Sequence, residues 1–89
     1  MLSVTTEKFR ICFTKLPKSI QLLAQKNYKI WMKDNNHPSI KFKQVHSTKP
    51  IFSARVGLAY RAIGVKQEDT MIWFWIGSHS DYNNLLQQL

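Results

Sequence analysis

The residues best suited to chemistry follow an apolar run, Met71–Gly77, and include His79 and Tyr82. A histidine can donate or accept a proton near neutral pH, and a tyrosine can do the same or stack on a nucleic-acid base. Cleavage of RNA through its ribose 2′-hydroxyl needs an acid, a base, and cations that stabilise the phosphorane. Alternatively, His79 is a solvated or helix-capping residue, and Tyr82 packs in the core against Trp73 or Trp75.

Two arginines could supply the cations. The segment Ile51–Ile63 is predicted to form a hairpin, because small and apolar residues alternate on both sides of the loop Gly57–Ala59. In the register that keeps those residues on one face, Arg55 lies opposite Arg61. Like charges at paired positions cost about 0.2–1 kcal/mol, which an anion between them would offset. Alternatively, two solvated guanidinium groups point apart, because salt screens their repulsion.

Basic and titratable residues elsewhere are predicted to contact the flanking phosphates of such a substrate. The segment Ile40–Val45 alternates in hydrophobicity, so Lys41 and Lys43 are expected to point away from the core. The predicted RNA-binding residues are Lys41, Lys43, His37, His46 and Lys49.

Other chemistries lack their motifs. One cysteine and three widely separated histidines provide no metal-site spacing, and no glycine-rich phosphate loop is present, so we expect no metal and no cofactor. Ser78, His79 and Asp81 are too close in sequence to form a catalytic triad. Cys12 lies among apolar residues, which favours a core thiol over a nucleophile.

Hydrophobic periodicity predicts the elements that hold these residues. Apolar residues at helical spacing predict a long helix from Pro17 to Asp34, whose basic side is a solvated face or a contact for a polyanion. Besides the hairpin arms, strands are expected at Phe9–Thr14, Ile40–Val45 and Thr70–Ile76. The last of these should be the central strand, covered on both faces. A polar turn at Gly64–Asp69 and a short helix at Asp81–Leu89, capped by Ser78 or Ser80, complete the prediction.

This order predicts an α+β fold with a mostly antiparallel sheet. The long N-terminal helix packs on one face, and the short helix follows the last strand. The opposite face of the sheet is expected to be open. By alternation, it would carry Lys41, Lys43, Arg55 and Arg61.

Length and charge limit the classes of protein that the chain can form. Its 89 residues predict a single domain, residues 1–89, with a modest core. Thirteen Lys and Arg against five Asp and Glu give a formal charge of +8. This balance favours a polyanionic partner, such as nucleic acid, an acidic protein or a membrane surface, over an inert basic domain. We expect a cytoplasmic protein, because no signal peptide or membrane-spanning run is visible.

Several motifs together resemble the RelE/ParE toxin superfamily, and the resemblance spans nearly the whole chain. The most telling are Tyr60-Arg61-Ala62-Ile63-Gly64 and Trp75-Ile76-Gly77-Ser78-His79. Supporting segments in the same order are Asn36–Lys43 and Phe52–Gly57. The resemblance implies a RelE-like α+β toxin of a type II toxin–antitoxin module, with an acidic antitoxin as partner.

In the RelE branch, the implied activity is metal-independent cleavage of mRNA in the ribosomal A site, which inhibits translation. Arg61 matches the family's strand arginine, Arg55 matches a basic residue on the preceding strand, and His79 and Tyr82 match its C-terminal residues. The last strand lacks an arginine that some RelE members carry. As an alternative, the ParE branch shares the fold but poisons DNA gyrase without chemistry. A third possibility is an inactive member that only binds an antitoxin.

Overall fold

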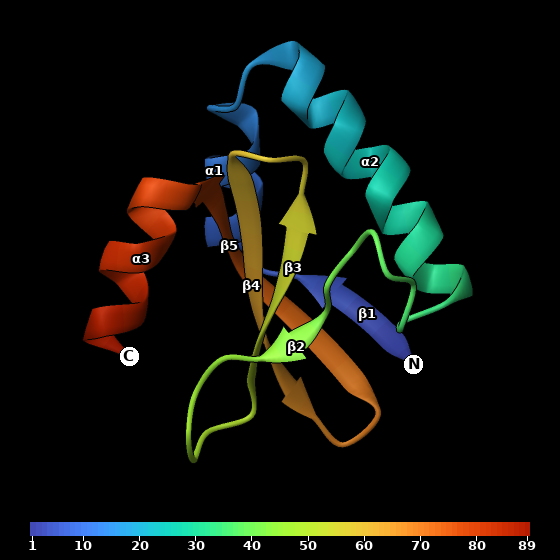
Figure 1. Ribbon diagram of the computed structural model, residues 1–89, viewed down its shortest axis with the longest axis vertical. Coiled ribbons are helices and arrows are strands. Elements are labelled where there is room, and N and C mark those ends of the chain that lie inside the picture. Colours follow the sequence, from blue (N-terminus) through green and yellow to red (C-terminus); the bar gives the residue numbers. More distant parts are fainter.

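The computed structural model describes residues 1–89 and has an α+β architecture (Figure 1). A five-stranded sheet has the order β1-β5-β4-β3-β2, in which only the β1–β5 pair is parallel. In chain order, the elements are β1 (Leu2–Thr5), α1 (Glu7–Thr14), α2 (Lys18–Lys33), β2 (Lys43–Gln44), β3 (Ile51–Val56), β4 (Tyr60–Gln67), β5 (Thr70–Ser78) and α3 (His79–Gln88).

The expected strand at Phe9–Thr14 is wrong, because these residues belong to helix α1. Thr6 caps this helix by accepting a hydrogen bond from the Phe9 backbone N–H at 3.1 Å. Phe9, Cys12, Phe13 and Leu16 pack on the core, at helical spacing, whereas Ile11 is 49% exposed. The segment thus fits both a two-residue and a helical period, and the Thr6 cap favours the helix.

Replacing Thr6 with alanine should lower the free energy of unfolding by about 0.5–2 kcal/mol, because the N-cap acceptor is lost. Urea denaturation followed by circular dichroism measures the change. Ser47→Ala, in an exposed loop, is the control and should have no comparable effect. Equal stability of the Thr6 variant and the wild type would contradict the capping role.

The long helix is confirmed as α2, within one residue of the expected bounds. The strand expected at Ile40–Val45 is largely wrong, because β2 contains only Lys43 and Gln44. Ile40 is buried as expected, but Lys41 has a positive φ of 49°. This left-handed backbone ends the alternation, so Lys41 is not part of the strand.

The predicted hairpin register is confirmed in β3 and β4, with Arg55 opposite Arg61 and the loop Gly57–Ala59 between the strands. The turn expected at Gly64–Asp69 is shorter, because β4 continues to Gln67. Strand β5 is interior, but β4 occupies the middle of the sheet.

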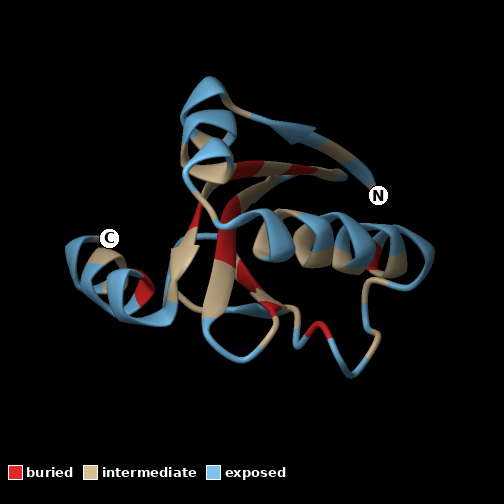
Figure 2. Ribbon diagram, turned by 90° about the horizontal axis from the view of Figure 1, so that it is seen from above, coloured by how far each residue is buried: buried red, intermediate tan, exposed pale blue.

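Both faces of β5 contribute to a core, as expected. One cluster, which includes Trp31, Met71 and Trp73, lies on the face covered by α1 and α2. The second, with Ile51, Ile63 and Tyr82, lies between the other face and α3. In Figure 2 the buried residues lie mainly on the strands, and the outer sides of the helices are exposed. The expectation that this second face is open is therefore wrong in part, since α3 covers it beside the arginines.

Candidate nucleic-acid interface

Arg55 of β3 and Arg61 of β4 face each other directly across the hairpin. The Arg55 backbone N–H donates to the Ile40 carbonyl oxygen at 2.7 Å, on the side away from β4. The two arginines therefore occupy a non-hydrogen-bonded position of the ladder, where Cα atoms are about 4.5 Å apart. Two half-buried cationic side chains thus start from adjacent points on one face of the sheet.

Both guanidinium groups turn back onto the β3–β4 turn. Arg55 Nε donates to the Gly57 carbonyl oxygen at 3.2 Å, and Arg61 Nη1 donates to the same oxygen at 3.1 Å. Arg61 Nη1 also approaches the carbonyl oxygens of Tyr60 (2.8 Å) and Leu58 (3.5 Å). No carboxylate is among these acceptors. The two Nη atoms of Arg55, and Nε and Nη2 of Arg61, stay free to bind an anion.

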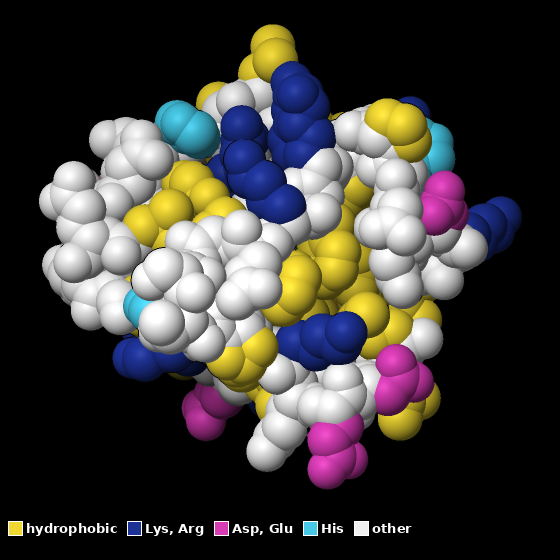
Figure 3. All heavy atoms as spheres, turned by 60° about the horizontal axis from the view of Figure 1, so that its bottom comes forward, with side chains coloured by type: hydrophobic (Ala, Val, Ile, Leu, Met, Phe, Trp, Pro, Cys, Tyr) yellow, Lys and Arg dark blue, Asp and Glu magenta, His cyan; other side chains and the backbone are white.

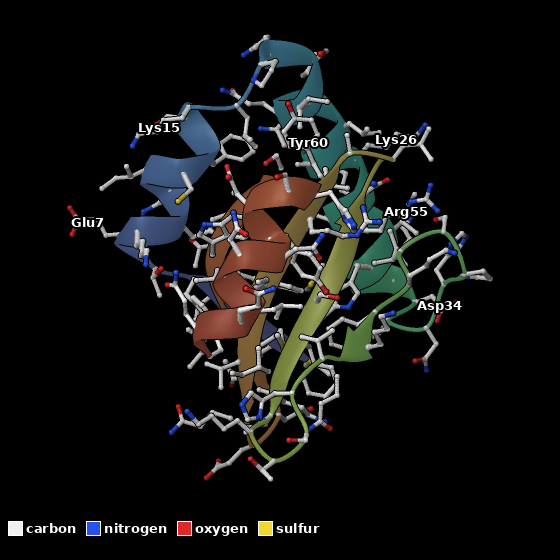
Figure 4. All side chains as sticks on the ribbon, turned by 60° about the vertical axis from the view of Figure 1, so that its left-hand side comes forward. Glu7, Lys15, Lys26, Asp34, Arg55 and Tyr60 are labelled. Atoms are coloured by element: carbon white, nitrogen blue, oxygen red, sulfur yellow. The ribbon has the colours of Figure 1, made fainter.

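Figure 4 shows Arg55 and Tyr60 near the same end of the sheet, with Glu7 on the opposite side of the molecule and Asp34 on the same side as Arg55 but further from Tyr60. The chain has thirteen Lys and Arg and only five Asp and Glu, and this net positive charge favours the approach of an anion.

His79 lies next to the same turn, because its backbone N–H donates to the Ala59 carbonyl oxygen at 2.7 Å. Its exposed ring stacks on Tyr82, with centroids 5.6 Å apart and an interplanar angle of 30°. The Ser78 hydroxyl caps α3 by accepting from the Asp81 backbone N–H at 3.1 Å, which fixes where the helix starts. The structure therefore brings His79 to the same end of the sheet as the arginines, and Tyr82 follows it one turn along α3 with its ring against that of His79.

Tyr82 is also a core residue. It is only 7% exposed and packs with Ile51 and Ile63, and Trp75 contacts this cluster. Trp73 belongs to the cluster on the other face of the sheet. Core packing of Tyr82, which the sequence left open as an alternative to a chemical role, is confirmed on the side of the sheet that holds Trp75.

Of the predicted RNA-binding residues, Lys43 is the one that the fold places near the arginine pair. It pairs with Ser53, and Arg55 lies two residues further along β3 on the same face. Such diagonal neighbours have Cα atoms about 7–8 Å apart. Lys41 is exposed but lies outside the strand, so the alternation does not direct it to this face.

His46 and Lys49 precede β3 and lie at its other end, separated from Val56 by roughly 15 Å of strand. The His46 Nδ1 accepts from the backbone N–H groups of Thr48 (3.1 Å) and Lys49 (3.0 Å). In the neutral tautomer, Nε2 then donates to the Leu89 carbonyl oxygen, which lies 3.1 Å away. This ring ties the loop to the end of α3 and is not brought to the arginine pair.

His37 likewise uses its ring locally. Its Nδ1 accepts from the Ser39 backbone N–H at 3.2 Å and lies 2.8 Å from the Ser39 hydroxyl oxygen. These contacts hold the turn after α2, and none joins His37 to Arg55 or Arg61.

No motif in the sequence predicted a role for Trp75 at this end of the sheet. Gly77 pairs with Arg61, and the Trp75 indole lies so close over Gly77 that an added Cβ would be 2.6 Å from the ring. The half-buried indole therefore occupies the position beside Arg61, where an aromatic surface can stack on a base or a guanidinium. The signal in the sequence was a glycine two residues after an aromatic residue in a strand.

A groove of about 760 Å³ lies on the other face, between the sheet, α1 and α2. Trp31 lines it, and the buried Trp31 Nε1–H has no hydrogen-bond acceptor. No acidic residue lines the groove, whereas Arg10 and Lys29 do; Arg55 also borders it, although its side chain starts on the α3 face of the sheet. Figure 3 shows one face of the molecule on which hydrophobic side chains lie in a hollow with Lys and Arg side chains at its margin.

No group of three His, Cys, Asp or Glu residues is arranged to hold a metal ion. None of the three helices has the length and hydrophobicity that a bilayer crossing requires.

Residues 18–84 match the family of ParE-like toxin domains. This segment is well over half of the chain, which therefore belongs to that family and to the RelE/ParE superfamily that its motifs resemble. No curated protein matches the chain in sequence.

Solved structures of this superfamily share the fold. A chain of the RelB–RelE antitoxin–toxin complex from Methanococcus jannaschii has a TM-score of 0.74 at 14% identity, covering 92% of this chain and 96% of that one. A chain of the RelE–RelB complex from Pyrococcus horikoshii has a TM-score of 0.68 at 13% identity, with coverages of 86% and 92%. YafQ from E. coli has a TM-score of 0.65 at 14% identity, with coverages of 90% and 94%. The RelE-like α+β fold expected from the sequence is confirmed.

Proposed function

We propose that the chain is the toxin of a type II toxin–antitoxin module and cleaves mRNA in the ribosomal A site. The observation that carries this proposal is the pair Arg55 and Arg61, which share one carbonyl acceptor and keep donors free at the turn that also accepts from the His79 backbone N–H. Two forked cations with no carboxylate among their acceptors favour a phosphate ligand. His79, whose backbone contacts the same turn, and Tyr82, on which its ring stacks, could transfer protons, which favours cleavage over binding alone.

In the proposed reaction, the ribose 2′-hydroxyl attacks the adjacent phosphorus, and the bond to the 5′-oxygen of the next nucleotide breaks. Arg55 and Arg61 stabilise the charge of the phosphorane. His79 and Tyr82 exchange the two protons, one taken from the 2′-hydroxyl and one given to the leaving oxygen. Lys43 neutralises a flanking phosphate, and Lys41, Lys49, His37 and His46 stay predicted contacts with the rest of the RNA.

An acidic antitoxin is the proposed protein partner. A formal charge of +8 and a groove lined by basic and apolar residues, without any acidic one, suit an acidic amphipathic segment. The M. jannaschii and P. horikoshii structures that share the fold are antitoxin–toxin complexes. Growth arrest that is reversed by co-expression of such a partner tests this part of the proposal.

Primer extension on mRNA after induction in growing cells tests the nuclease activity directly. Cleavage inside translated codons, absent when translation is blocked, is the expected result. Growth arrest with intact mRNA would overturn the proposed chemistry.

A second candidate function is poisoning of DNA gyrase without chemistry, because the matching family is that of ParE-like toxin domains. It would produce DNA breaks that depend on gyrase and leave mRNA intact. The proton-transfer side chain of His79 would then be dispensable, so a His79 variant separates the two functions.

His79→Ala should slow mRNA cleavage by about 10²–10⁴-fold, because an acid or base is removed. The ring is exposed and stacks on Tyr82 alone among the aromatic residues, so the fold should persist. Rates in a translation extract measure the effect, and circular dichroism checks the fold. Asn83→Ala, exposed on the same helix, is the matched control and should cleave at the wild-type rate. Full activity of His79→Ala would exclude its proton-transfer role.

A further inference from the structure

Gly57 is the first residue of the β3–β4 turn and adopts the left-handed conformation, with φ of +70°. Residues with a Cβ rarely adopt this backbone conformation, which glycine reaches without strain. The space beside Gly57 is also filled, since an added Cβ would lie 2.7 Å from Leu23 Cδ2. Leu23 belongs to α2, so the long helix packs directly against this turn.

This backbone conformation aims one carbonyl oxygen at two cations. The Gly57 oxygen accepts from Arg55 Nε and from Arg61 Nη1, at 3.2 and 3.1 Å. Two residues later, the Ala59 carbonyl accepts from the His79 backbone N–H at 2.7 Å. The same short turn therefore contacts three of the four predicted catalytic residues.

The shared oxygen also reduces the repulsion between the two arginines. Arg55 and Arg61 occupy directly paired positions, where like charges repel and solvated side chains would point apart. A carbonyl oxygen between them carries partial negative charge and holds both guanidinium groups on one side. Asn27 of α2 adds a contact, because its Nδ2 donates to the Arg55 carbonyl oxygen at 3.5 Å.

We propose that Gly57 is a positioning residue, whose carbonyl oxygen sets the separation and direction of Arg55 and Arg61 so that both can bind one phosphate. The inference rests on the proposed function for its consequence in cleavage, but the positioning itself can be tested without RNA. The role belongs to the backbone carbonyl of Gly57, so the types of the charged side chains alone do not predict it.

Gly57→Ala should rotate the turn out of the left-handed conformation and move the carbonyl oxygen away from the arginines. Misplacement of reacting groups by about 1 Å can slow a reaction by about 10²-fold, and a loss of this size in mRNA cleavage is expected. Leu58→Ala is the matched control in the same turn, because the Leu58 side chain is 83% exposed and its backbone contacts do not need that side chain.

Nitrogen-15 NMR of the arginine Nε–H groups in the RNA-free protein tests the positioning. In the wild type and in Leu58→Ala, the Arg55 Nε–H should exchange slowly with water, because it is hydrogen-bonded. In Gly57→Ala it should exchange rapidly. If Gly57→Ala fails to fold, the double variant Leu23→Ala/Gly57→Ala replaces it, because removal of Leu23 Cδ2 makes room for the added Cβ. Leu23→Ala alone is then its control and should show the slow exchange of the wild type.

The outcomes separate the inference from the proposed function. Rapid exchange in Gly57→Ala together with slow cleavage supports both. Rapid exchange in a protein whose wild type cleaves no mRNA supports the positioning and overturns the nuclease proposal. Unchanged exchange in the folded Gly57→Ala variant overturns the positioning role, whatever the cleavage rate.

Discussion

Replacing Arg61 with alanine is expected to abolish growth arrest while the protein stays folded. In the proposed reaction, this guanidinium stabilises charge that develops on the phosphorane. Removal of one such donor typically slows a reaction by about 10²–10³-fold, or about 3–4 kcal/mol of transition-state stabilisation. The fold should tolerate the change, because Arg61 donates only to backbone carbonyl oxygens of its own turn and faces a second cation. The free energy of unfolding should therefore change by no more than about 1 kcal/mol.

Single-turnover cleavage of mRNA on a programmed ribosome measures the loss of rate, and urea denaturation measures the free energy of unfolding. Lys8→Ala is the control, because it removes the same charge from an exposed position on α1. A general effect of net charge would slow both variants alike. Wild-type cleavage by Arg61→Ala, or a loss of activity that only follows unfolding, would contradict the role given to this arginine.

Two substitutions of Tyr82 should distinguish its packing role from its proposed role in proton transfer. Tyr82→Ala removes a ring that is 7% exposed and packs between α3 and the sheet. Removal of a buried aromatic ring costs about 3–5 kcal/mol, a large part of the roughly 5–15 kcal/mol that stabilises a domain. The midpoint of thermal unfolding should fall by more than about 10 °C. Tyr82→Phe keeps the ring and should keep most of this stability.

Cleavage by Tyr82→Phe then reports on the hydroxyl group alone. If that group transfers a proton, the rate should fall by about 10²-fold or more in a stably folded protein. Wild-type cleavage by Tyr82→Phe would leave Tyr82 with a purely structural role, as a platform on which the His79 ring stacks. Wild-type stability of Tyr82→Ala would contradict the packing itself.

The hairpin shows how far the sequence alone could be taken. The alternation on either side of Gly57–Ala59 was enough to pair Arg55 with Arg61, and the structure has this register. Alternation settles a register because a slip by one residue would turn every side chain to the wrong face. A capping hydroxyl predicted the start of the last helix less sharply: the sequence left Ser78 and Ser80 open and expected the helix from Asp81, whereas α3 starts at His79 and Ser78 is its cap.

Helix α1 shows where local patterns are ambiguous. Over eight residues, Phe9, Ile11 and Phe13 fit a strand, while Phe9, Cys12 and Phe13 fit a helix. Short apolar segments often satisfy both periods. The Thr6 cap favours the helix, and β1 already occupies the edge of the sheet beside β5.

The sequence by itself determined the long helix, the hairpin register, the last strand and the residues able to do chemistry, because these depend on side-chain type and short spacing. It did not predict β1, and it assigned α1 as a strand. Only the tertiary structure decided which of those residues meet. It placed α3 against the face expected to be open, left His46 at the far end of β3, and joined Arg55 to Arg61 through the Gly57 carbonyl. Periodicity defines the two faces of an element, but the packing of distant segments decides what each face contacts. Every residue has a backbone carbonyl, and only the folded conformation decides which groups that carbonyl contacts.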